Sequence, residues 1–213
     1  MDAHGTVTAE EGDRYPLKPP QIMSNTFIIS DTHWGHQAAC TIFKKDDGTP
    51  LRPFKDADEA DEAMVERWNK VVRAQDKVYH LGDVVMPKNH RKLEEIMPRL
   101  NGTKVLIKGN HDELKPARYL EHFKDIRGSH LLDNLVLTHI PLHPASVLRW
   151  RGNIHGHLHS YAVLRTNHVK SDGTIMYHEQ AEDPKYFCAS VERIDFTPIE
   201  FEVVNKIFKD RGI

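Results

Sequence analysis

The feature that most constrains this sequence is a recurring pattern in which a short apolar segment gives way to Asp, Asn or His. Three of these segments are rich in β-branched or aromatic residues and are predicted strands: Thr26–Ser30, Lys77–Leu81 and Thr103–Lys108. Two more follow at Leu135–Thr138 and Gly152–Ile154, and a last predicted strand covers Tyr186–Glu192. Each of the first five is predicted to end where a polar side chain begins a loop.

Helical patterns lie between the apolar segments. Apolar residues recur every three or four positions over residues 58–73 and 89–100, and a short helix is predicted over 116–123. The spacing Thr197-Pro198-Ile199-Glu200 is that of a capping box with proline at the first helical position, so it predicts the start of a last helix. The alternation of strands and helices favours an α/β layered fold over residues 23–213, after a flexible or strap-like leader at 1–22.

The polar residues at the strand ends form one candidate site. In open α/β sheets, ligand sites lie outside the carboxyl ends of the strands, so these residues are expected to meet at one edge. Two aspartates, four histidines and one asparagine make a mixed oxygen and nitrogen set, which suits Mn, Fe, Zn or Ni better than calcium. The seven candidate metal ligands are Asp31, His33, Asp83, Asn110, His139, His157 and His159.

The local spacing of these residues has physical reasons. In an extended chain, the first and third residues of Asp31-Thr32-His33 point to the same side, and His157-Leu158-His159 repeats that spacing. The glycines at positions 82, 109 and 156 allow the backbone to approach the site closely. Asp83 can bridge two ions through its two carboxylate oxygens.

The order D-x-H, G-D, G-N-H-D, H, G-H-x-H, from Asp31 to His159, resembles the signature of the calcineurin-like metallophosphoesterases, in particular small single-domain bacterial and phage members. The resemblance implies a four-layer α/β/β/α sandwich with a dinuclear metal site at the carboxyl ends of the strands. It implies that one metal is held by Asp31, His33, Asp83 and His159, and the other by Asp83, Asn110, His139 and His157. It also implies a catalytic role for His111 at the leaving group or the transition-state charge.

The expected function is phosphoester hydrolysis by two divalent metal ions and a bridging hydroxide, with the ions ~3.5–4 Å apart. Nucleotide-like small phosphoesters are the expected substrates, cleaved as phosphodiesters or phosphomonoesters. Two alternatives are a nuclease acting on DNA or RNA, and a non-catalytic interaction module with the same fold. Near-neutral charge argues against the nuclease, and the complete set of ligand residues argues against the module.

Three further residues are candidates for substrate binding: His36, Arg52 and His155. The alternatives are a supporting role for His36, a surface ion pair for Arg52, and orientation of His157 by His155. His80 lies inside a predicted strand and is expected to be a core histidine with its hydrogen bonds satisfied. Asp112 is expected to cap the turn after His111 or to orient that residue.

Composition and net charge limit the partners and the cellular location that this chain is expected to have. The 213 residues carry a formal net charge of -2, which provides no general attraction for nucleic acid or an anionic membrane. No apolar run approaches the ~20 residues that span a bilayer, and residues 1–20 lack the apolar core of a secretory signal. Cys40 and Cys188 are distant in sequence and are expected to be reduced, so a cytoplasmic location is predicted.

Overall fold

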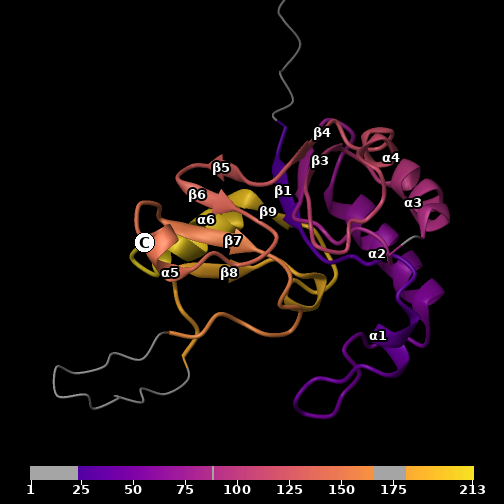
Figure 1. Ribbon diagram of the computed structural model, residues 1–213, viewed down its shortest axis with the longest axis horizontal. Helices are drawn as coiled ribbons and strands as arrows, with labels where there is room; N and C mark the ends of the chain where they lie inside the picture. The colour runs from indigo at the N-terminus through magenta and orange to yellow at the C-terminus, as the bar shows by residue number, and fades with distance from the viewer. Residues whose placement is uncertain (1–23, 88, 166–180) are drawn as a thin grey trace, which may run out of the picture.

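The computed structural model describes residues 24–87, 89–165 and 181–213, in which two β-sheets and several helices pack together (Figure 1). The predicted leader at 1–22 lies outside the described residues. One sheet has five strands in the order β4-β3-β2-β1-β9, and the other has four in the order β5-β6-β7-β8. The predicted mixed α/β fold with two sheets is therefore confirmed.

The five-stranded sheet is parallel at its centre. Strands β1 (Thr26–Ile29), β2 (Lys77–His80) and β3 (Thr103–Ile107) pair in parallel, so their carboxyl ends lie at one edge. Strand β4 (Asp125–Arg127) continues this direction beside β3, while β9 (Ile199–Glu200) runs antiparallel to β1. The central strands are almost wholly buried, which explains why they are apolar on both faces.

The four-stranded sheet contributes two further carboxyl ends to the same region. Strands β6 (Leu135–Leu137) and β7 (Gly152–His155) pair in parallel, and β8 (Tyr186–Cys188) is parallel to β7. Strand β5 (His130–Leu132) forms a hairpin with β6. The two turn residues, Asp133 and Asn134, have φ values of 45° and 59°, the conformation that two-residue hairpins require.

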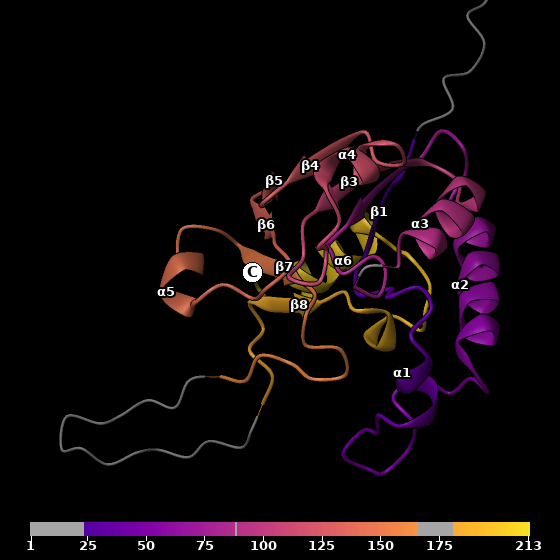
Figure 2. The same cartoon turned by 45° about the vertical axis from the view of Figure 1, so that its right-hand side comes forward.

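Helices cover one face of the five-stranded sheet (Figures 1 and 2). Helix α2 (Ala57–Val71), helix α3 (His90–Ile96) and helix α4 (Pro116–Leu120) supply Trp68, Leu93 and Tyr119 to a core shared with β1, β2 and β3. The Asp56 carboxylate accepts a hydrogen bond from the Glu59 N–H at 3.0 Å and so caps the start of α2. None of the described helices combines the length and apolar character that a membrane crossing requires.

A second core lies between the sheets. Ile28, Tyr79 and Val105 pack there with Leu135 and Ile154 of the second sheet. Helix α6 (Phe201–Asp210) adds Phe201, Val204 and Phe208. The remaining short elements are α1 (Gln37–Thr41), α5 (Pro144–Val147) and the 3₁₀ turns Met97–Arg99 and Val191–Arg193.

Three sequence predictions need correction. The last helix begins at Phe201, because Ile199 and Glu200 instead pair with Ile28 and Phe27 at the edge of the five-stranded sheet. The Thr197 hydroxyl donates to the Asp195 carbonyl, so it forms no capping box. The helix predicted to reach residue 100 becomes a 3₁₀ turn at Met97–Arg99, where Pro98 lies, and the strand predicted to reach Glu192 ends at Cys188.

We expect Trp68→Ala to destabilise the fold by about 3–5 kcal/mol, because it empties a large site in the helix-covered core. Trp68 is 0% exposed, and its indole N–H donates to the Asn101 carbonyl at 3.0 Å. Urea unfolding measures the loss. Val203→Ala is the control, since Val203 on α6 is 48% exposed. A loss below about 1 kcal/mol for Trp68→Ala would contradict the packing described here.

Candidate metal centre

Five loops bring the candidate ligands to the common edge of the two sheets. The loop after β1 carries Asp31 and His33, and its backbone N–H groups donate to the carbonyls of Gly82 and Asp83 in the loop after β2, both at 3.0 Å. Asn110 follows β3, His139 follows β6, and His157 follows β7. Parallel pairing within each sheet is what places these loops side by side.

The side chains form two groups that could each hold a metal ion. Asp31, His33 and His159 make one group, and Asp83, His139 and His157 make the other. Within each group, the potential ligand atoms lie within 4.8 Å of one another. The Asn110 side-chain oxygen joins the second group, 2.8 Å from His139 Nε2 and 3.0 Å from His157 Nδ1.

Asp83 lies between the two groups. Its Oδ2 atom is 3.4 Å from His33 Nε2 and 3.3 Å from His139 Nε2, so one carboxylate oxygen faces both groups. Its Oδ1 atom accepts a hydrogen bond from the His111 backbone N–H at 2.8 Å. Burial opposes the charge of Asp83, but His139, the His111 N–H and His33 outweigh that effect and lower its pKa to about 2.

The imidazole tautomers suit a metal. Burial lowers the pKa of His139, but the hydrogen bond to Asp83 and the charges of Asp31 and Asp83 outweigh it and raise that pKa. His139 Nδ1 donates to the Leu81 carbonyl at 2.7 Å, so when the ring is neutral its lone pair is on Nε2 and faces the oxygens of Asp83 and Asn110. Three acceptor atoms then converge, and a cation satisfies all of them. Burial lowers the pKa of His33 to about 2, so this imidazole is neutral at physiological pH, and its buried Nδ1 has no hydrogen-bond partner among the described residues. The residues present therefore fit divalent metal ions.

The backbone at these residues departs from the extended conformation that the sequence spacing suggested. Five of the seven candidate ligands have a positive φ: Asp31 at 58°, His33 at 41°, Asp83 at 54°, His157 at 69° and His159 at 51°. The expectation that Asp31 and His33, two positions apart, point to the same side because the chain is extended is therefore wrong. The left-handed conformation is unfavourable for residues with a Cβ and is concentrated at functional sites, where surrounding contacts maintain it.

Close approach of the backbone explains two of the three glycines that precede ligands. A Cβ on Gly109 would overlap Asp83 Oδ1, and a Cβ on Gly156 would overlap Ser30 Oγ and Asp31 Oδ2. Any other residue at these positions would displace the carboxylates.

Hydrogen bonds from outside the ligand set hold the loops in place. The buried Asp112 carboxylate accepts from the N–H groups of Asp83, Val84 and Gly109, at 2.9, 3.0 and 2.8 Å. These donors precede His111, so Asp112 joins the loops after β2 and β3 and does not make the predicted cap after His111. His80 meets the Thr32 hydroxyl at 3.0 Å and accepts from the Gly82 N–H at 3.2 Å, so it is a satisfied core histidine as predicted.

The sequence predictions missed Glu192 and Ser190, which follow β8. His159 Nδ1 donates to Glu192 Oε2 at 3.2 Å, and the Ser190 hydroxyl donates to Asp31 Oδ2 at 2.8 Å. Burial alone would raise the pKa of Glu192, but Arg52 and His159 outweigh it and hold that pKa at about 2. Both residues come shortly after the apolar strand Tyr186–Cys188, as the other candidates follow theirs, but the predicted strand extended to Glu192 and so included them.

Arg52 is not placed to bind substrate or to make a surface ion pair. Its side chain is 1% exposed, and it donates to the carbonyls of Asp31 and Thr32, both at 2.7 Å. A third hydrogen bond, at 2.9 Å, reaches Glu192. The prediction of a phosphate contact is therefore wrong, and Arg52 instead holds the loop that carries Asp31 and His33.

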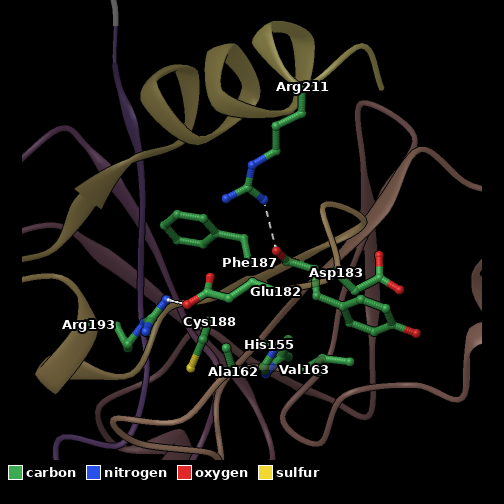
Figure 3. Close-up of a pocket in the computed structure, with 10 residues that line it drawn as sticks. His155, Ala162, Val163, Glu182, Asp183, Phe187, Cys188, Arg193 and Arg211 are labelled. Atoms are coloured by element: carbon green, nitrogen blue, oxygen red, sulfur yellow. Dashed lines mark hydrogen bonds and ion pairs between the residues drawn. The ribbon is translucent and has the colours of Figure 1, made fainter. Parts of the chain in front are cut away.

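His155 is also enclosed in the protein. It lines a cavity of about 70 Å³ whose walls also carry Arg193 and Arg211. Figure 3 shows it beside Ala162 and Val163. Its ring is 0% exposed, and Nδ1 donates to the Gly156 carbonyl at 2.7 Å. A direct substrate contact is excluded by this burial. The alternative role, orientation of His157, stays a prediction, because this bond reaches Gly156 and not His157 itself.

His36 and His111 remain beside the two groups with access to solvent. Their rings lie 5.6 Å and 5.5 Å from that of His33, and His111 is exposed while His36 is partly buried. Both are therefore within reach of a molecule bound at the candidate metal centre.

Comparison with known proteins bears on what this centre does. The sequence profile of the calcineurin-like phosphoesterase superfamily domain matches residues 25–192, which include every candidate ligand. The chain belongs to the calcineurin-like phosphoesterase superfamily. Metal-dependent phosphoester hydrolysis is the activity typical of this superfamily, so the chain is a hydrolase of that general kind.

Two relatives and one solved structure are similar over defined parts of the chain. An uncharacterised protein of Methanocaldococcus jannaschii is 32% identical over 189 residues, which are 88% of this chain and 93% of that protein. The gene 66 protein of Mycobacterium phage L5 is 31% identical over 102 residues, 47% of this chain and 45% of its own length. A crystal structure of an Aquifex aeolicus protein of unknown function has the same fold, with a TM-score of 0.57 at 23% identity, covering 87% of this chain and all of the other.

We expect Glu192→Gln to weaken metal binding about 10- to 100-fold, because His159 loses the carboxylate that orients its ring. Competition with a chromophoric chelator measures the affinity. Glu182→Gln is the matched control, since Glu182 pairs with Arg193 at the surface at 2.7 Å and contacts no candidate ligand. Unchanged affinity in a folded Glu192→Gln protein would show that Glu192 does not support the centre.

Proposed function

We propose that this chain is a dinuclear-metal phosphoester hydrolase that acts on nucleotide-like small phosphoesters, as a phosphodiesterase or phosphatase. The observation that carries the proposal is the position of Asp83, whose Oδ2 atom faces His33 at 3.4 Å and His139 at 3.3 Å. A carboxylate shared by two groups of ligands is the arrangement that a two-metal centre needs.

The residues divide between holding metal and handling substrate. One ion is assigned to Asp31, His33, Asp83 and His159, and the other to Asp83, Asn110, His139 and His157; Mn, Fe, Zn and Ni all suit these donors. When bound, such ions activate a water molecule and neutralise charge on the phosphoryl oxygens. His111, held by the bond from its backbone to Asp83 and open to solvent, is assigned to protonate or hydrogen-bond the departing oxygen.

Two observations support an enzyme of small substrates over the alternatives. All seven candidate metal ligands are present and lie close together, whereas a non-catalytic module has no need of a full set of metal ligands. The net charge of -2 offers no general attraction for a nucleic acid backbone. We also propose a cytoplasmic location, since Cys40 and Cys188 are both free and buried.

The direct test is hydrolysis of bis-p-nitrophenyl phosphate and p-nitrophenyl phosphate by the full chain. Assays with added Mn, Fe(II), Zn or Ni are compared with assays in excess chelator. Turnover that requires metal supports the proposal, and the ratio of the two rates reports whether diesters or monoesters are preferred. No turnover of either ester by protein with two bound metals would favour the non-catalytic module.

We expect Asp83→Ala to abolish hydrolysis and to lower the metal content, because both groups of ligands lose their shared oxygen. Asn110→Ala is expected to act in the same direction through the second group alone. Elemental analysis of the purified proteins measures the metal. Asp210→Ala is the control, as Asp210 pairs with Lys206 on the surface of α6. Full metal content in Asp83→Ala would contradict the assignment.

We expect His111→Ala to lower kcat on the order of 10²–10⁴-fold while both metals are retained, since this side chain is assigned to the leaving group. Its bond to Asp83 comes from the backbone and survives the substitution. Steady-state kinetics and elemental analysis on the same sample check both parts. Loss of both metals in this variant would show that His111 is a ligand instead.

A further inference from the structure

An apolar groove opens beside the candidate metal centre. Ile42, Phe43 and Leu51 line it from one segment of the chain, and Leu158 and Tyr161 line it from another. His157 and His159 belong to the same lining, so the groove adjoins both groups of ligands. Its volume of about 460 Å³ lies within the roughly 300–1,000 Å³ of small-molecule pockets and exceeds what a bare phosphate needs.

The large apolar side chains around this groove are unusually open to solvent. Ile42 is 68% exposed, Phe43 is 48% exposed, and Tyr161 is 54% exposed. Isolated exposed apolar residues are common, but a contiguous set around a concavity is typical of a binding site. The exposed rings therefore provide apolar surface that a ligand can cover.

Hydrogen bonds join the segments that form the walls of the groove. The Leu51 N–H donates to the Phe43 carbonyl, and the Lys45 N–H donates to the Thr49 carbonyl, both at 2.8 Å, which closes a small hairpin. The Tyr161 hydroxyl donates to Asp46 Oδ1 at 2.9 Å and ties this hairpin to the loop after His159. The two walls are thus joined across 115 residues of sequence.

Aromatic rings connect the groove to the metal ligands. The His33 and His36 ring centroids are 5.6 Å apart, and those of His36 and Phe43 are 5.4 Å apart. Both contacts are edge-to-face. A molecule bound at the candidate metal centre that extends past His36 would therefore meet Phe43.

We propose that the groove binds the flat aromatic group of the substrate, so that this hydrolase prefers phosphoesters carrying a nucleobase or a similar ring. The inference rests on the proposed function and deepens it. Phe43 and Tyr161 offer stacking surfaces, and every nucleobase has a ring face to stack. The Asp46 carboxylate accepts the hydrogen bond from Tyr161. Ile42, Leu51 and Leu158 add aliphatic surface to the two rings, and the polar Lys44 and Ser160 complete the lining together with His157 and His159.

The first test compares two cyclic diesters with the same reacting centre, adenosine 2′,3′-cyclic phosphate and glycerol 1,2-cyclic phosphate. For Phe43→Ala we expect KM to rise about 5- to 100-fold with the adenosine ester and to stay unchanged with the glycerol ester. Phe43→Tyr, which keeps the ring, is expected to behave as wild type. Leu148→Ala is the surface control, since Leu148 is 72% exposed beside α5. Equal losses with both esters would overturn the inference.

The second test needs no catalysis. Adenosine, which has no phosphate, is titrated into the full chain in excess chelator and followed by NMR, with glycerol as the control ligand. We expect shifts at Phe43, Leu158 and Tyr161, and at least fivefold weaker binding by Phe43→Ala. No shift at these residues overturns the groove assignment even if hydrolysis is found. Adenosine binding by a protein that hydrolyses neither ester would instead locate the failure in the proposed function.

Discussion

The arrangement of this protein depends on one carboxylate, that of Asp83, which faces imidazoles from both sides of the candidate centre. His33 approaches it from the loop after β1, and His139 approaches it from the second sheet. The two sheets must therefore be packed in a fixed relation before the centre exists. The core between them, with Ile28 and Tyr79 on one side and Leu135 and Ile154 on the other, sets that relation.

Maintaining this geometry is unfavourable locally, and the surrounding structure offsets the cost. Five of the candidate ligands adopt positive φ values, and several carboxylates and imidazoles are buried. Arg52 binds the carbonyls of Asp31 and Thr32, Glu192 orients His159, and Asp112 gathers three backbone N–H groups. An intact buried ion pair adds little net stability, although removing one of its partners is strongly destabilising. Arg52 and Glu192 are therefore better understood as a rigid support for the loops than as a source of stability.

What the sequence could predict followed from local pattern. The strands β1, β2 and β3 were predicted to within one residue at each end, because each is a continuous apolar run in a buried parallel sheet. The convergence of Asp31 and Asp83 followed from the rule that parallel strands of one sheet deliver their carboxyl ends to one edge. His139 follows β6 of the second sheet, so its approach to Asp83 depends on how the two sheets pack.

Other features depended on contacts between distant residues. Arg52 and Glu192 are 140 positions apart, and neither shows by itself that it will be buried with the other. The Thr197-Pro198 pair reads locally as a helix start, yet pairing of Ile199 with Ile28 at the sheet edge prevailed. The positive φ values were missed because a spacing of two is also compatible with an extended chain, and only the packed loops distinguish these conformations.

Anomalous diffraction from crystals of the manganese-reconstituted protein tests the central claim most directly. The account predicts two adjacent peaks at the manganese absorption edge on either side of the Asp83 carboxylate, one beside His33 and His159 and the other beside His139 and His157. A single peak, or peaks that Asp83 does not contact, would contradict it.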